Sequence, residues 1–76
     1  MGTTWTLRTP QGNRLFGVAY GNNIFVAVGE LGTILTSRDG VNWTQRTSPT
    51  NNGLEGVAYG NGVFVAVGGG TILTSP

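Results

Sequence analysis

The chain has 76 residues, with four basic and three acidic side chains, no histidine, no cysteine and a formal net charge of +1. This composition rules out a disulfide framework and argues against a structural metal site, a nucleic-acid partner and an anionic membrane surface. The length allows one small domain, whose core is marginal unless another element or another chain completes it.

Two nearly identical copies of one pattern occupy the chain. Residues 5–37 and 43–75 align when Trp5 is placed on Trp43, and both contain Gly-Val-Ala-Tyr-Gly-Asn followed by Phe-Val-Ala-Val-Gly. A period of 38 to 39 residues is typical of a repeat architecture. We therefore expect one structural unit to occur twice.

In chain order, segments rich in β-forming residues alternate with turn formers, and no stretch has the apolar spacing of a helix. Tyr-Gly-Asn-Asn (20–23) and Tyr-Gly-Asn-Gly (59–62) place Asn and Gly where a tight hairpin needs positive φ. Glu30-Leu31-Gly32 and Gly69-Gly70 serve the next hairpin of each copy, and Arg38-Asp39-Gly40 serves a third. The predicted strands are 5–10, 15–20, 24–29, 33–37, 42–47, 54–59, 63–68 and 71–75.

The apolar runs predict how these strands are stacked. Phe-Val-Ala-Val at 25–28 and again at 64–67 is apolar at consecutive positions, so both faces of these strands should be buried. Residues 5–9 and 43–47 instead alternate roughly between apolar and polar, as an outer strand does. Small four-stranded antiparallel sheets, stacked face to face and wet only at the outer edge, are the blades of a β-propeller.

Ser37-Arg-Asp-Gly-Val-Asn-Trp43 resembles the Asp-box, roughly Ser-x-Asp-x-Gly-x-x-Trp, shortened here by one residue between Asp and Gly. The whole repeat is similar to bacterial propellers related to the photosystem II assembly factor and to sialidase-type repeats. The resemblance implies a structural box formed by Ser37, Asp39, Gly40 and Trp43 on the hairpin between the third and fourth strands of a blade. It implies no catalytic residues, because sialidase chemistry needs an arginine cluster, whereas Arg8 and Arg46 occupy equivalent outer-strand positions.

A second box is split between the two ends of the sequence. Ser75 and Pro76 match its first half, Gly2 and Trp5 match its second half, and Met1 stands where the Asp should be. We therefore expect residues 1–76 to form one two-repeat propeller fragment, engineered or excised. It would comprise an outer strand at 5–10 that completes a neighbour's blade, an intact blade at 15–47 and three strands of a split blade at 54–75.

This division predicts a closed ring built by head-to-tail homo-oligomerisation with strand exchange, and hence an even number of blades. Blades turn by about 51° in a seven-bladed propeller, by about 45° in one with eight blades and by about 60° in one with six. Four chains and eight blades are favoured because the distortion is smaller. Small residues on the inner strands keep three chains and six blades as the next choice.

Three hypotheses about function follow. The first is a self-assembling structural protein whose partner is itself, without catalytic, cofactor or metal sites. The second is a lectin-like or protein-binding module, for which the candidate ligand residues are Tyr20, Asn22, Tyr59 and Asn61; their structural interpretation as turn and packing residues is simpler. The third, an enzyme, has no motif in its favour. We expect no signal peptide or transmembrane segment, and therefore cytoplasmic expression.

Overall fold

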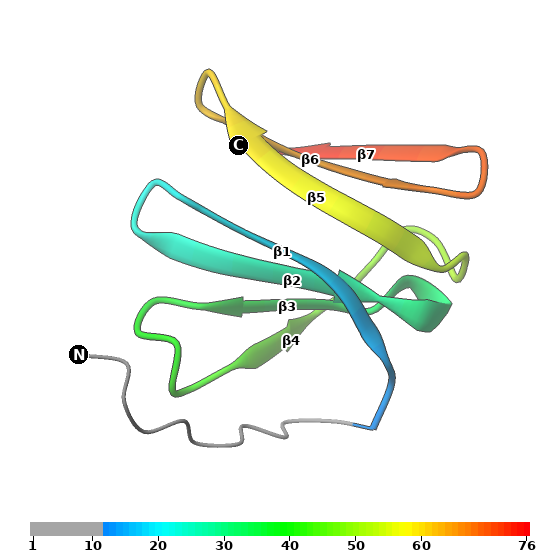
Figure 1. Cartoon of the computed structure of the whole chain (residues 1–76), viewed down its shortest axis with the longest axis horizontal. Helices are drawn as coiled ribbons and strands as arrows, with labels where there is room; N and C mark the ends of the chain where they lie inside the picture. The colour runs from blue at the N-terminus through cyan, green and yellow to red at the C-terminus, as the bar shows by residue number, and fades with distance from the viewer. Residues whose placement is uncertain (1–11) are drawn as a thin grey trace.

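The computed structural model describes residues 12–76, which form two antiparallel β-sheets stacked on each other (Figure 1). The first sheet has the strand order β1-β2-β3-β4 and the second has the order β5-β6-β7. The predicted all-β class is confirmed, and the described part of the chain contains no α-helix. The elements are β1 (Leu15–Gly21), β2 (Ile24–Gly29), the 3₁₀ turn η1 (Glu30–Gly32), β3 (Ile34–Ser37), β4 (Thr44–Arg46), β5 (Leu54–Gly60), β6 (Val63–Gly68) and β7 (Thr71–Ser75).

The observed strands follow the predicted ones closely, and β3 begins one residue later than predicted because Thr33 caps the η1 turn. β1 and β5 run one residue further than predicted, because Gly21 and Gly60 still pair with the first residues of β2 and β6. β4 is shorter than predicted, since Asn42 and Trp43 belong to the turn that precedes it. The predicted outer strand at 5–10, with Gly2 and Trp5, lies outside the described residues.

The two inner hairpins have the backbone that their sequences predicted. Asn22 and Asn23 have φ values of 50° and 65°, and Asn61 and Gly62 have φ values of 54° and 80°. Two consecutive residues with positive φ define the type I′ geometry that matches the twist of the strands they join. These asparagines are therefore required by the turn itself.

The loop that leads into β1 is attached to the η1 turn of the first sheet. The backbone N–H of Glu30 donates to the carbonyl of Arg14 at 2.9 Å, and the Glu30 carboxylate accepts from the N–H of Arg14 at 2.8 Å. Asn13 Nδ2 donates to Thr33 Oγ1 at 2.8 Å, and this hydroxyl donates to the Glu30 carbonyl at 2.7 Å. These bonds fix the start of β1 against the far end of β2.

The core lies between the sheets. Val26 and Val28 of β2 pack with Leu54, Phe64 and Ala66 of the second sheet. β2 is buried on both faces, as predicted, with Val26, Ala27 and Val28 all less than a tenth exposed. The same prediction is wrong for β6 in the single chain, where Val67 is 43% exposed. The difference arises because the second sheet is packed against the first on one face only.

Candidate functional site

The main candidate site is the pair of sheet faces by which the two halves of the chain contact each other. The aliphatic face is the face of the first sheet that contacts the second. The aromatic face is the face of the second sheet that contacts the first. The aliphatic face carries Gly17, Ala19, Ile24, Val26, Val28 and Ile34, and the aromatic face carries Val57, Tyr59, Phe64, Ala66 and Leu73.

Glycine allows the two inner strands to approach closely. A Cβ atom placed on Gly17 of β1 would lie 3.1 Å from the Cα of Gly56 on β5, which is tighter than ordinary van der Waals contact. A Cβ on Gly21 would fall inside the ring of Tyr59. The two sheets therefore meet through a backbone contact at Gly17 and a ring seated on Gly21, and neither site tolerates a larger residue without movement.

Each face also occurs a second time in the chain, because the sequence is repeated. The aliphatic face recurs on the far side of the second sheet as Gly56, Ala58, Val63, Val65, Val67 and Ile72. The aromatic face recurs on the far side of the first sheet as Val18, Tyr20, Phe25, Ala27 and Leu35. The residues keep the same strand register in both copies.

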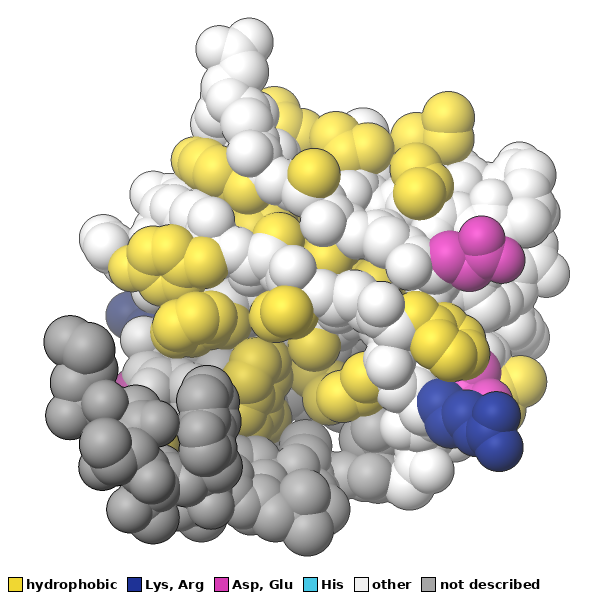
Figure 2. All heavy atoms as spheres, in the orientation of Figure 1, with side chains coloured by type: hydrophobic (Ala, Val, Ile, Leu, Met, Phe, Trp, Pro, Cys, Tyr) yellow, Lys and Arg dark blue, Asp and Glu magenta, His cyan; other side chains and the backbone are white. Residues whose placement is uncertain are grey.

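The second copy of the aliphatic face is exposed at Val67 and Ile72, and that of the aromatic face is exposed along β1, whereas its Ala27 and Leu35 are buried. Val67 is 43% exposed, whereas its counterpart Val28 is 1% exposed. Ile72 is 72% exposed, and Val18 and Tyr20 are 62% and 55% exposed. Figure 2 shows hydrophobic side chains gathered over the inner strands β1 and β5. In soluble proteins, contiguous exposed apolar side chains often mark contact surfaces.

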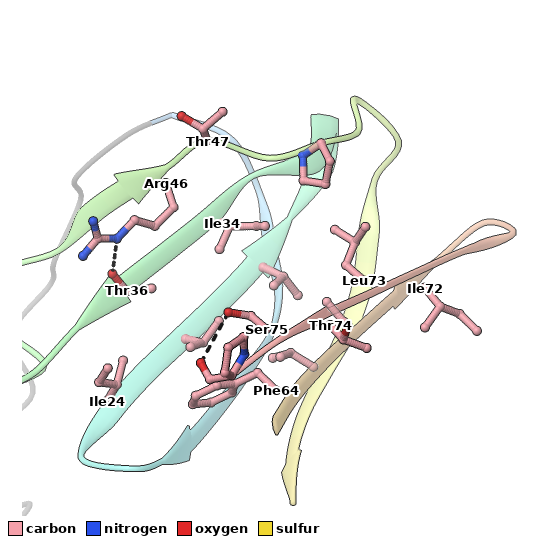
Figure 3. Close-up of a pocket in the computed structure, with 16 residues that line it drawn as sticks. Ile24, Ile34, Thr36, Arg46, Thr47, Phe64, Ile72, Leu73, Thr74 and Ser75 are labelled. Atoms are coloured by element: carbon pink, nitrogen blue, oxygen red, sulfur yellow. Dashed lines mark hydrogen bonds between the residues drawn. The ribbon is translucent and has the colours of Figure 1, made fainter. Parts of the chain in front are cut away.

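A cleft of about 600 Å³ opens between the outer parts of the two sheets. Figure 3 shows Ile34, Thr36 and Arg46 on the first sheet, across the cleft from Leu73 and Ser75 on β7. In the first sheet the fourth strand pairs with β3, and Arg46 Nε donates to Thr36 Oγ1 at 2.8 Å. Among the described residues, β7 has no strand on its outer edge. The cleft therefore borders the open edge of β7.

The turn between β3 and β4 is built around the Asp39 carboxylate. Its Oδ1 accepts from the backbone N–H groups of Val41 and Asn42 at 2.8 Å and 2.9 Å. The Ser37 hydroxyl accepts from the Gly40 N–H at 2.8 Å and donates to Asp39 at 3.0 Å. Asp39 thus accepts from the turn backbone.

Trp43 folds back onto the first sheet from the same turn. Its Nε1 donates to the Gly40 carbonyl at 3.1 Å, and its ring lies 6.4 Å from that of Phe25, measured between ring centroids. The resulting arrangement is a closed structural turn, since the polar groups of Ser37 and Asp39 are used to hold backbone.

Stability should depend on the protonation of Asp39. Hydrogen bonds from the Asn42 and Val41 N–H groups, and then from Ser37, lower the pKa of this carboxyl from 3.8 to about 2. A depressed pKa means that the folded state favours the carboxylate, so this stabilisation is complete above about pH 4 and is lost as the pH falls through about 2. We expect Asp39→Ala to lower Tm near neutral pH, and the difference from the unchanged chain to shrink as the pH falls to about 2. Thermal melts of both chains across this range test the prediction, which a pH-independent difference would contradict.

The four candidate ligand residues lie at the ends of the inner hairpins. Tyr20 packs against Phe25 and Tyr59 against Phe64, each with tilted rings whose centroids are 4.6 Å apart. Asn22 and Asn61 are exposed and occupy the first central position of their turns. Of the predicted split box, Ser75 and Pro76 lie beside the cleft at the end of β7, while Gly2 and Trp5 lie outside the described residues.

Sequence reasoning missed two features of the site. It did not find the contact of Tyr59 with Gly21, which joins residues of different repeats, nor the cleft beside β7. The contact of Tyr59 with Gly21 could have been predicted from the repeat. Each copy has a Tyr followed by a Gly, and neighbouring strand residues point to opposite faces, so stacked copies can bring the Tyr of one onto the Gly of the other.

Within residues 12–76, no His, Cys, Asp or Glu side chains gather in a group that could hold a metal ion. No helix in this part of the chain has the length and apolar character needed to cross a membrane.

No protein-family model, curated protein or solved structure matches the chain.

Proposed function

We propose that the chain is a self-assembling structural protein, a two-sheet unit of an Asp-box β-propeller whose copies associate head to tail into a closed ring. The observation that supports this is the repetition of one interface. The chain contains one aliphatic face docked on one aromatic face, and it presents a second copy of each, exposed at Val67 and Ile72 on the second sheet and at Val18 and Tyr20 on the first. The aromatic face of a second copy therefore fits the free aliphatic face of the first by the same contacts.

The fit extends to the details of the inner strands. Between β1 and β5, the contact depends on the absence of a side chain at Gly17. Gly56 stands at the equivalent place on the free aliphatic face, and a Cβ there would meet only Val67, at an ordinary 3.8 Å. A second copy can thus bring its own β1 against Gly56 as closely as β5 approaches Gly17.

Strand exchange would complete the second sheet in the same ring. Residues 5–8, Trp-Thr-Leu-Arg, match 43–46, Trp-Thr-Gln-Arg, which include β4. In the register of β3 with β4, Leu35 lies opposite Gln45. By the repeat, Leu7 of a neighbouring copy would lie opposite Leu73, on the face that borders the cleft. An apolar residue at this position suits an apolar cleft.

Repeating a head-to-tail contact closes a ring when its rotation divides the full circle. Two sheets per copy make the number of sheets even. We favour four chains and eight sheets, with three chains and six sheets next, because about 45° per sheet departs less than about 60° from the about 51° of a seven-bladed ring.

Sedimentation velocity over a hundredfold range of concentration tests this function. A closed ring predicts one main species whose mass stops increasing once assembly is complete. A single 7.9 kDa species at all concentrations would contradict the proposal, as would a mass that keeps growing with concentration.

A further inference from the structure

One contact between the two sheets joins a tyrosine to a glycine, and the repeat places an equivalent tyrosine and an equivalent glycine on the exposed faces. Tyr59 of β5 lies against Gly21 of β1, so closely that a Cβ on Gly21 would fall within the Tyr59 ring. The counterparts are Tyr20, at the end of β1, and Gly60, at the end of β5. Tyr20 is 55% exposed, and a Cβ placed on Gly60 would meet no atom within 4 Å.

The exposed tyrosine has the same pose as the covered one. The rings of Tyr20 and Phe25 have centroids 4.6 Å apart at an interplanar angle of 51°, and those of Tyr59 and Phe64 have centroids 4.6 Å apart at 54°. The Tyr20 hydroxyl also donates to Asn23 Oδ1 at 3.4 Å. Because the ring is already stacked in position, docking would cost it little conformational entropy.

The exposed glycine likewise has the backbone of the covered one. Gly60 pairs with Val63 across the hairpin, as Gly21 pairs with Ile24. Among residues 12–76 nothing lies within 4 Å of a Cβ built on Gly60, so these residues give no packing reason for its lack of a side chain. At Gly21 there is such a packing reason, because the absence of a side chain makes room for the Tyr59 ring.

We propose that Tyr20 of one copy docks on Gly60 of the next and that this contact determines which surfaces can join. The inference rests on the proposed function, since its partner is a second copy of the chain. It adds that one aromatic ring, Tyr20, occupies the space left by one glycine, Gly60. The contact at these hairpin ends would therefore select which surfaces can associate. Any side chain at position 60 would occupy the space of the ring.

The test is Gly60→Ala in the full chain. Within the part of the chain that the structure describes, the added methyl meets no atom, so the strand content and the melting of the dissociated chain should be unchanged. At the interface it should overlap the Tyr20 ring and raise the concentration of half-assembly at least about tenfold, as measured by sedimentation.

Gly69→Ala is the matched control. A Cβ at Gly69 also meets no atom within 4 Å. Its counterpart in the first copy is Glu30, whose side chain coexists with the docked second sheet, where the Glu30 Cα is 3.7 Å from a Cβ built on Gly53. Assembly of this variant should stay within about twofold of that of the unchanged chain.

A double-mutant cycle with Tyr20→Ala identifies the contact itself. Once the ring is gone, adding Gly60→Ala should cause no further loss of assembly, because the methyl then has nothing to displace. Full assembly of Gly60→Ala, or the same tenfold loss in the absence of the Tyr20 ring, would overturn the proposed contact while leaving the ring intact. An unchanged chain that stays monomeric would instead refute the proposed function.

Discussion

Removing residues 1–10 is expected to abolish the closed ring. The outer edge of β7 would then lack the strand that we assign to residues 5–8 of a neighbour, and the cleft lined by Phe64 and Leu73 would stay open to water. Sedimentation should show separate chains at concentrations where the full chain assembles. Strand content measured by circular dichroism should persist, since the described sheets lie within residues 15–75.

A point substitution separates the lost strand from any effect of truncation. Leu7→Asp would place a charge in the apolar cleft, and it should raise the concentration of half-assembly more than about tenfold, since an unpaired buried charge costs several kcal/mol. Leu7→Met is the control, because it keeps an apolar side chain of similar volume at the same position. Rings that survive both the truncation and Leu7→Asp would show that the sheets join without strand exchange.

The second large effect is expected at Leu54. This side chain is fully buried between the sheets, beside Val26 and Val28. Leu54→Ala should lower the free energy of unfolding by about 2 to 5 kcal/mol, from the lost transfer energy and the cavity left behind. A chain of this length has about 4 to 11 kcal/mol in total, so the variant should be partly unfolded at moderate temperature. Urea unfolding followed by tryptophan fluorescence measures the change.

The repeat supplies a control for this prediction. Leu15 is the counterpart of Leu54 and is 45% exposed. In a dissociated background such as Gly60→Ala, Leu15→Ala should cost less than about 1 kcal/mol. In the assembling chain it should weaken the ring, because a second copy would cover Leu15 as the first sheet covers Leu54. Equal losses of unfolding free energy from Leu54→Ala and Leu15→Ala in the dissociated chain would contradict the assignment of Leu54 to a covered face and Leu15 to an exposed one.

The parts of the fold that sequence predicted are those that local chemistry determines. Asn22, Asn23, Asn61 and Gly62 dictate two type I′ turns by their tolerance of positive φ. Asp39 could be placed in a turn where its carboxylate accepts from nearby N–H groups, since all of its partners lie within three residues of it.

The parts that sequence did not predict depend on how the sheets meet in space. The identical runs at 25–28 and 64–67 predict identical burial, yet Val28 is covered and Val67 is not, because only one face of the second sheet has a neighbour within the chain. The seating of Tyr59 on Gly21 and the cleft beside β7 are likewise set by the stacking of the sheets.

Identical chains are proposed to close into a ring by repeating the contact between the two sheets. A native mass spectrum of the 76-residue chain tests this most directly, because it counts the subunits. We predict one dominant species containing four 7.9 kDa chains, and three chains would keep the ring while correcting its size. A spectrum dominated by the single chain would contradict the account, and so would a ladder of masses without a preferred number.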